Sequence, residues 1–350
     1  MMTDSMQISE ATEADAAAWD AYVEVARDAT FFHRFGWRNV IKRAYGYSSC
    51  YVMARRGGRI VGVLPMIDVK SSLLGRNLIS TAFTVGGGIV ADDAEVCEAL
   101  AQGAVDEGRR RRVKYVELRS RSAVVEGWEV KNDVYAGFET TFAADEAANL
   151  KEIPRRRRAE VRKGLDALAA GDLRYDFDDG ARAFYPLYAQ AMRDHGTPIF
   201  PQKFVTVLME EFKGCADILI IRAQEEPVLA LLSFHFRDRV MPYYFGARAD
   251  ARAHRAYDLA IWLQMRRGAA RGARIFDFGR SKYGAGSFDY KVYWGFEPTP
   301  LAYQYALIGA RRMPNVNPQN AKFSAASAAW RRLPLAAANL AGPLLARHLA

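Results

Sequence analysis

The chain has 350 residues, half of them apolar and a quarter charged, which is an ordinary composition for a soluble globular protein. Its length predicts two domains rather than one large core. The formal net charge of +9 depends on two tetra-arginine runs, residues 109–112 and 155–158, because removing their eight charges leaves 9 − 8 = +1. Two local patches argue against a surface that coats nucleic acid, and solvated charge runs are their commoner meaning.

The cysteines and the apolar pattern indicate the compartment. Cys50, Cys97 and Cys215 are odd in number and far apart, without a CxxC pair, so we expect no disulfide framework and no metal site. The first residues lack the basic and apolar regions of a signal peptide, and no apolar run reaches the ~18 residues of a membrane-spanning helix. The sequence therefore predicts a reduced, cytoplasmic protein.

In chain order, the first half predicts a helix, a hairpin, a short strand, a second helix and a further strand. The first helix falls near residues 14–28, and residues 50–70 form two strands around an Arg-Gly-Gly-Arg turn. The short strand "NLISTAF" leads to three glycines. Helical spacing follows in "DDAEVCEALAQGAVDEG", and residues 113–120, "VKYVELRS", form the last strand.

The second half repeats this order. Residues 215–248 predict three strands, 257–272 a helix and 273–281 the strand after it. In both copies the last strand carries an acid, Glu117 or Asp277, and is followed by Arg-Ser. The sequence therefore predicts a duplicated α/β domain with mixed sheets.

A basic helix is predicted between the copies, over residues 151–171. Its apolar stripe consists of Val161, Leu165 and Leu168. Arg157 and Arg158 flank this stripe, so these two arginines are positioned to reach a cleft while their neighbours stay in water. A basic helix that simply faces water is an equal alternative.

The segment after the last strand, "IFDFGRSKYGAGSFDYKVYWGFEP", combines glycines, cations and aromatic residues. It is not a P-loop, because Ala285 follows Gly284 where a lysine is needed. It is not a dinucleotide fingerprint, because Asp289 replaces the third glycine and we expect no helix after the strand there. The composition instead suits a site for an anionic, partly planar ligand, or a turn that simply carries many charged and aromatic side chains.

The residue types favour a transfer reaction without metal or covalent nucleophile. Histidines lie in dissimilar contexts and no GxSxG elbow occurs, although His195 in "RDHGTPIFP" is a candidate for a substrate loop. Asp277 is a candidate base, and Lys282 or Lys291 would neutralise a developing oxyanion. The alternatives are a structural Asp–Arg pair and solvated lysines, which Glu117 at the equivalent strand position supports.

Four segments together resemble a known family: "TFFHRFGWRNVIKRAYGY", "NLKEIPRRRRAEVRKGL", "MRDHGTPIFPQKF" and the strand-end segment quoted above. They resemble the FemAB-like branch of the GNAT acyltransferase superfamily, most of all the FemAB-related proteins that accompany exosortase/PEP-CTERM exopolysaccharide systems. The resemblance implies two tandem GNAT-like domains and acyl or aminoacyl transfer to an amine. FemAB-type enzymes use aminoacyl-tRNA, and other relatives are expected to use acyl thioesters.

The chain departs from the family in the pyrophosphate loop. GNAT proteins that bind acetyl-CoA carry a Q/R-x-x-G-x-G/A loop before the central helix, whereas this chain has "ARADARAHRAYDLA" with no glycine after Gly246 until the helix nearly ends. Acetyl-CoA bound in the usual manner is therefore not expected. The second domain also lacks the long charged helical pair of some tRNA-dependent relatives, so a tRNA donor is possible but not favoured.

These observations predict an N-terminal GNAT-like domain (residues 1–150), a basic linker helix (151–171), a C-terminal GNAT-like domain with the site (172–312) and a helical tail (313–350). The predicted activity is N-acyl or aminoacyl transfer to an amine of a cell-envelope or exopolysaccharide precursor. No cofactor is expected to bind tightly, and the co-substrate is an acyl-CoA, another thioester or an aminoacyl-tRNA. The predicted catalytic residues are Asp277 and Lys291, and the predicted substrate-binding residues are Arg157, Arg158, His195, Tyr244, Arg280, Lys282 and Trp294.

Two other functions stay open. The altered pyrophosphate loop favours a non-catalytic scaffold that binds an envelope precursor or export partner, and the arginine runs alone suggest an RNA-binding protein; DNA is not an expected partner. The tail from Leu333 is apolar, and we expect it to pack on the domains rather than lie on a membrane surface, with peripheral contact at the inner membrane as the alternative.

Overall fold

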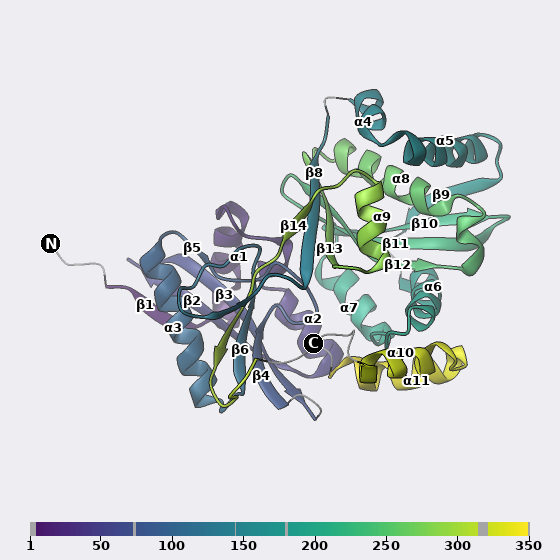
Figure 1. The fold of residues 1–350 in the computed structure, drawn as a ribbon. Coiled ribbons are helices and arrows are strands. Elements are labelled where there is room, and N and C mark those ends of the chain that lie inside the picture. Colours follow the sequence, from purple (N-terminus) through teal and green to yellow (C-terminus); the bar gives the residue numbers. More distant parts are fainter. Residues whose placement is uncertain (1–4, 73–74, 144, 179–180, 314–320, 349–350) are drawn as a thin grey trace. The chain divides into compact units, whose positions relative to one another are not determined.

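The computed structural model describes residues 5–72, 75–143, 145–178, 181–313 and 321–348. They form two compact units, each assembled from separate stretches of the chain (Figure 1). The first unit consists of Met1–Tyr135, Pro300–Asn317 and Leu345–Ala350, and the second consists of Ala136–Thr299 and Pro318–Leu344. Each unit combines a mixed sheet with helices, which confirms the predicted α/β class.

The first unit contains an eight-stranded sheet in the order β1-β2-β3-β4-β6-β15-β7, with β5 paired to β3. Its strands are β1 (Gln7–Glu10), β2 (Ser48–Arg56), β3 (Arg59–Ser71), β4 (Gly75–Ser80), β5 (Val90–Ala91), β6 (Tyr115–Arg119), β7 (Glu129–Lys131) and β15 (Tyr303–Leu307). Its helices are α1 (Ala16–Val25), α2 (Trp37–Tyr45) and α3 (Ala94–Arg110), with 3-10 turns η1 (Glu13–Asp15) and η2 (Phe31–His33).

Side chains along β2 point alternately to the two faces of this sheet, and both faces are buried. Cys50 and Val52 point into the core that α3 closes. Tyr51 points the other way and stacks on Trp19 of α1, with ring centroids 5.1 Å apart. Successive strand residues face opposite sides, so a strand buried on both sides is apolar nearly throughout.

The second unit contains a seven-stranded sheet in the order β14-β8-β13-β12-β11-β10-β9. Its strands are β8 (Tyr135–Thr141), β9 (Leu173–Asp178), β10 (Ala216–Ala223), β11 (Glu226–Phe236), β12 (Arg239–Ala247), β13 (Ile275–Lys282) and β14 (Pro298–Pro300). Its helices are α4 (Glu146–Glu152), α5 (Arg155–Ala169), α6 (Ala181–Asp194), α7 (Gln202–Glu211), α8 (Ala256–Ala270), α9 (Gly286–Tyr293), α10 (Ala321–Arg331) and α11 (Leu335–Ala346), with the 3-10 turn η3 (Ala249–Arg252).

The predicted basic helix is α5, and it is part of the second unit. It packs along α8 (Figure 1). Val161 of its predicted apolar stripe is fully buried, and Gly164 allows close approach, because a Cβ there would lie 2.9 Å from the Cβ of Leu259. The helix is thus held by α8 rather than acting as a separate linker.

A reciprocal exchange of strands sets the boundaries of the units. β15, from the end of the chain, lies between β6 and β7 of the first sheet. β8, from the first half, lies between β13 and β14 of the second sheet. The boundaries therefore differ from those predicted, since pairing between distant strands leaves no local mark on the sequence.

The parallel strands of each sheet diverge at equivalent places. β4 pairs with β6 at Leu78–Val116 and at the next residue pair, and in the described chain the ladder goes no further. β12 and β13 likewise pair at Arg239–Ile275 and at the following pair. The shared divergence supports the duplication and leaves the later part of β13 unpaired to β12.

Gly246→Ala tests the close approach of α6 to β12. A Cβ on Gly246 would lie 2.7 Å from the carbonyl carbon of Leu187 and 2.7 Å from the Cα of Tyr188, and helix backbone cannot move aside as a flexible side chain can. We expect the substitution to lower the free energy of unfolding by about 1–3 kcal/mol, measured by urea denaturation.

The matched control is Gly286→Ala at the start of α9, where an added Cβ meets no atom within 4 Å. This change should leave stability the same or raise it slightly, because Ala favours a helix over Gly by about 1 kcal/mol. Equal stability of the two variants would contradict the proposed contact.

Candidate active site

The candidate site lies at the end of β13 and in α9. Gly284, with φ of +73°, turns the chain after the strand, and α9 begins at Gly286. The expectation that no helix follows this strand is therefore wrong. α9 has only eight residues and its apolar side chains are interrupted by Asp289 and Lys291, so its helical period is hard to recognise.

Lys291 is the most unusual residue of the site, because it is a lysine with only 7% of its surface exposed. Its Nζ donates hydrogen bonds to the carbonyl oxygens of Gly279, at 3.2 Å, and Arg280, at 3.0 Å. The same nitrogen lies 5.3 Å from the ring centroid of Phe138 and 5.1 Å from that of Phe278. Aromatic faces and backbone oxygens thus replace water around the amine.

Burial lowers the pKa of Lys291 to about 7, an effect that the nearby Asp277 carboxylate opposes and Arg280 reinforces. Asp277 itself is half-buried, and its Oδ1 accepts a hydrogen bond from the Gly279 N–H at 2.9 Å. Gly279 has φ of +67°, a conformation that suits glycine and places its carbonyl oxygen against the amine. The structure therefore brings together three predicted site residues: Asp277, Arg280 and Lys291.

Asp258, in the first turn of α8, anchors the neighbouring side chains and was not predicted from the sequence. Its Oδ1 accepts hydrogen bonds from the Tyr290 hydroxyl and from Trp294 Nε1, each at 2.9 Å. Its Oδ2 lies 3.2 Å from Arg157 Nη1. The acid in "YDLA" resembles an ordinary helix-start residue, so only the distant partners reveal its function.

These contacts give Arg157 and Trp294 structural partners. The indole of Trp294 is 3% exposed, so little of it is available as a wall for a ligand. Arg157 ion-pairs with Asp258 and also lies over the Tyr290 ring, 5.7 Å from its centroid. Both residues hold α9 in place, and direct contact with substrate stays a prediction.

The other predicted binding residues are dispersed. Tyr244 is buried among aromatic rings of α6, α7 and β12, including Tyr188 at 5.7 Å. Arg158 donates to the Lys151 carbonyl oxygen, and His195 is exposed in the connection after α6. Lys282, half-buried at the end of β13, has a pKa lowered by burial and belongs by position to the same strand end as Asp277.

The start of α8 does not favour a pyrophosphate. η3 occupies the preceding loop, and Asp258 in the first turn of the helix has its carboxylate engaged by Arg157, Tyr290 and Trp294. A helix N-terminus attracts anions through its unsatisfied N–H groups, but the glycines that let a pyrophosphate approach them are missing from residues 247–255. The structure thus agrees with the altered loop of the sequence.

The equivalent strand end of the first unit is occupied by a structural ion pair. Arg119 Nε donates to Glu117 Oε1 at 2.8 Å, and both residues are almost fully buried. In this copy the acid on the strand forms a structural pair with an arginine, which is the alternative to a catalytic role that the sequence left open. The second copy instead places Lys291 beside its acid.

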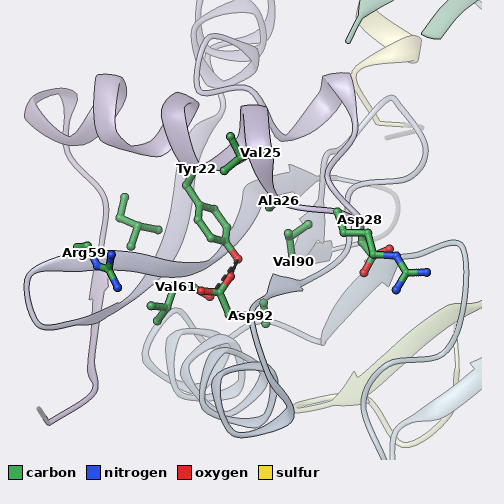
Figure 2. Close-up of a pocket in the computed structure, with 11 residues that line it drawn as sticks. Tyr22, Val25, Ala26, Asp28, Arg59, Val61, Val90 and Asp92 are labelled. Atoms are coloured by element: carbon green, nitrogen blue, oxygen red, sulfur yellow. Dashed lines mark hydrogen bonds between the residues drawn. The ribbon is translucent and has the colours of Figure 1, made fainter. Parts of the chain in front are cut away.

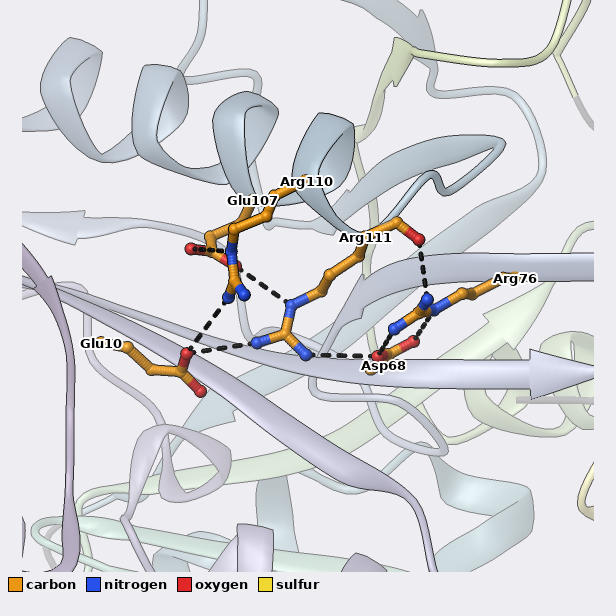
Figure 3. A network of polar contacts seen from close by, with 6 residues as sticks. All are labelled: Glu10, Asp68, Arg76, Glu107, Arg110 and Arg111. Atoms are coloured by element: carbon orange, nitrogen blue, oxygen red, sulfur yellow. Dashed lines mark hydrogen bonds and ion pairs between the residues drawn. The ribbon is translucent and has the colours of Figure 1, made fainter.

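The first arginine run is also engaged by acids (Figure 3). Arg111 lies between Asp68, Glu107 and Glu10, at 3.2, 3.1 and 3.2 Å. Burial raises the pKa of Asp68, but hydrogen bonds from Arg76 and Arg111 outweigh it and hold the pKa below its ordinary value. This run holds the unit together, which weakens the case for an RNA-binding patch.

Among the described residues, one group has candidate ligand atoms close enough together to hold a metal ion: Glu10, Cys50 and Glu107. Arg111 already contacts both glutamates, and burial raises the pKa of the Cys50 thiol to about 12. A protonated thiol is a poor ligand, and a guanidinium already supplies the positive charge. The group therefore suits an arginine better than a metal ion.

The first unit also has a pocket of about 570 Å³ (Figure 2). The Tyr22 hydroxyl within it donates to Asp92 Oδ1 at 2.9 Å, and burial, together with this acid, raises the pKa of the phenol. Arg59 and Asp28 stand at its rim. No predicted site residue lines the pocket, and its tyrosine stays protonated, so the candidate catalytic group remains Lys291.

Comparison with known proteins identifies a family match in the second unit. Residues 155–292, which are 138 of the 350, match the family model described as an acetyltransferase (GNAT) domain. The match lies within the second unit and includes Asp258, Asp277 and Lys291. A search of curated protein sequences finds no significant match.

Solved structures show the same fold over most of the chain. FemX matches with a TM-score of 0.68 and 12% identity, over 87% of this chain and 98% of its own. A tandem GNAT protein from the clavulanic acid biosynthesis pathway matches with a TM-score of 0.55 and 9% identity, over 87% of this chain and 98% of its own. L-PGS from Bacillus licheniformis matches with a TM-score of 0.56 and 10% identity, over 93% of this chain and 99% of its own. The fold is a tandem GNAT fold, and with the family match it supports a transferase.

Lys291→Met tests the lowered pKa through stability. Between pH 7 and 10 the unfolded chain holds a proton on Lys291 that the folded protein has lost, so the free energy of unfolding rises with pH, by up to about 1.4 kcal/mol per pH unit. Below pH 7 both states hold the proton. We expect the wild type to gain stability relative to the variant between pH 7 and 10, measured by urea denaturation at each pH.

The matched control is Lys163→Met on the exposed side of α5, which should give a difference that does not vary over this range. If the Lys291→Met difference is equally constant, the lowered pKa is refuted.

Asp258→Ala tests the anchor. The change leaves Arg157, Tyr290 and Trp294 without the carboxylate that they share, and removing one partner of a buried ion pair typically costs about 3–5 kcal/mol. We expect a large loss of the free energy of unfolding in urea. Arg156→Ala, on an exposed residue of the same basic run, should change it by no more than about 0.5 kcal/mol. Equal effects would mean that Asp258 is not an anchor.

Proposed function

We propose that the protein transfers an acyl or aminoacyl group to an amine of a cell-envelope or exopolysaccharide precursor, in the second unit. The GNAT family match supports the reaction class, and the resemblance to FemAB-related proteins of exosortase/PEP-CTERM systems supports the acceptor class. The observation that carries the proposal is Lys291, a buried amine with a pKa of about 7 at the end of β13.

A lysine with this pKa suits proton transfer, because both of its forms are accessible near neutral pH. In the neutral form, two N–H groups satisfy the carbonyl oxygens of Gly279 and Arg280, and the lone pair is left to accept a proton. The proposed role of Lys291 is therefore the general base. It replaces Asp277, the candidate base from the sequence, in that role.

The step conserves atoms and charge. The acceptor nitrogen attacks the acyl carbonyl, a C–N bond forms, and the C–S bond of a thioester or the C–O bond of an aminoacyl ester breaks. The proton passes from the nitrogen to Lys291 and then to the departing sulfur or oxygen. Asp277 stabilises the ammonium that forms in between, since its charge raises the Lys291 pKa. Arg280 and Lys282 remain the proposed ligands for anionic groups of the substrates.

The donor is proposed as an acyl thioester or an aminoacyl-tRNA. The loop before α8, which forms η3 and lacks the glycines of a pyrophosphate loop, disfavours acetyl-CoA held there by its pyrophosphate. A thioester bound through other groups is compatible with the site.

The test is the pH dependence of turnover. Purified protein is given acetyl-CoA, a long-chain acyl-CoA or mixed aminoacyl-tRNAs, with an extract of envelope precursors as acceptor, and N-acylated products are measured by mass spectrometry. We expect kcat/KM to fall below pH 7 as Lys291 becomes protonated. Lys291→Ala and Lys291→Arg should each lose about 10²–10⁴-fold, because neither supplies a neutral amine.

Asp277→Asn separates the two possible assignments. It removes the charge that raises the Lys291 pKa, so the acidic limb of the profile should move to lower pH while activity remains. If Asp277 is the base and Lys291 holds the oxyanion, Asp277→Asn abolishes turnover, Lys291→Arg retains some, and activity falls above pH 7 instead.

A scaffold protein is the second candidate, and the altered pyrophosphate loop before α8 favours it. Retention of a precursor without consumption of any of the donors would support binding without chemistry.

A further inference from the structure

The last helix, α11, packs on the second unit through its small residues. Ala338 is 2% exposed, and Gly342 is buried against Ile199, whose Cγ2 lies 2.8 Å from the position of an added Cβ. The preceding tail is held by Arg193 Nη1, which donates to the Leu333 carbonyl oxygen at 3.2 Å. The predicted packing of the tail is thus seen on one face of α11.

The opposite face of α11 presents its large apolar side chains to solvent. Leu340 is 78% exposed and Leu344 is 64% exposed. The two are one turn apart, and the exposed residues Ala336 and Ala337 continue the stripe by a further turn. A helix whose only role is to cover its own domain buries leucines and exposes small or polar residues, so this arrangement is inverted.

The part of the sequence that carries this stripe is basic. Residues 298–350 contain no Asp or Glu and six Lys or Arg: Arg311, Arg312, Lys322, Arg331, Arg332 and Arg347. Arg331 and Arg332 are exposed and stand immediately before α11. The half-exposed Trp330 beside them is a residue type that favours the boundary between water and lipid.

The helix is suited to lie on a bilayer rather than cross it. α11 has 12 residues, fewer than a span requires, and none of the helices within the described residues is long and apolar enough to cross a membrane. An apolar stripe flanked by cations is the arrangement with which surface helices bind anionic lipid.

We propose that this tail face, defined by Arg331, Arg332, Leu340 and Leu344, docks the protein on the surface of an anionic lipid bilayer. The leucines enter the acyl boundary while the arginines contact lipid phosphates. Ala338 and Gly342 keep the helix attached to the second unit during binding. The occupant is lipid rather than a second copy of the chain, because the segment that carries the stripe has six cations and no acid, so two such segments would repel each other.

The experiment is flotation of the purified full chain with vesicles of phosphatidylcholine alone or with 30% phosphatidylglycerol. We expect binding to the anionic vesicles that weakens at high salt, and at least tenfold weaker binding to neutral ones. The double variant Leu340→Ser/Leu344→Ser and the double variant Arg331→Ala/Arg332→Ala should each lower the apparent affinity at least tenfold. Val25→Ser is the matched control, because Val25 is 79% exposed on α1, away from the tail in sequence.

Three results would overturn the proposal: no binding to anionic vesicles, binding that both double variants retain, or an equal loss with Val25→Ser. Light scattering in free solution tests the rival occupant, since a dimer that the leucine variant dissociates would assign the stripe to self-association. Circular dichroism confirms that the variants fold. The readout is independent of turnover, so its failure leaves the proposed transfer reaction untouched.

Discussion

The second unit depends on one buried carboxylate, that of Asp258. It joins α5, through Arg157, to α9, through Tyr290 and Trp294. A buried acid is tolerated only when donors replace its water, and here three side chains do so. Lys291 follows Tyr290 in the chain, so the contacts that fix α9 also fix the candidate base. The anchor and the site are therefore parts of one arrangement.

The two copies differ in the charged groups that they bury at the equivalent strand end. In the first, Glu117 and Arg119 form a buried pair whose charges compensate each other. In the second, Lys291 is buried against rings and carbonyl oxygens, and its pKa falls to about 7 because this shell does not fully stabilise its charge. A lysine that destabilises the folded state at neutral pH needs another reason to be there, and perturbed groups of this kind gather at functional sites. This asymmetry favours the second unit as the active one.

Local patterns predicted the elements well and their long-range connections poorly. The hairpin around Gly57 and Gly58, the helix α8 and the order of elements in each copy follow from periodicity and turn residues, which act over a few positions. The exchange of β8 and β15, and the ion pair of Asp258 with Arg157, join residues more than a hundred positions apart. Nothing in the neighbouring sequence records such pairings. The short helix α9 was missed because charged residues interrupt its apolar period.

The positive charge of the chain is also located differently by counting residues in the sequence and by following the contacts of the arginines. By count, the arginine runs explain the surplus of +9, but Arg111 and Arg157 are bound by acids in their own units. Residues 298–350 contribute six cations and no acid, which leaves 43 − 40 = +3 for the rest of the chain. The surplus is therefore concentrated in the part of the sequence that also exposes Leu340 and Leu344. A segment with cations, no acids and exposed leucines suits an anionic lipid surface better than a nucleic acid, because a bilayer can bury the leucines and a phosphate backbone cannot.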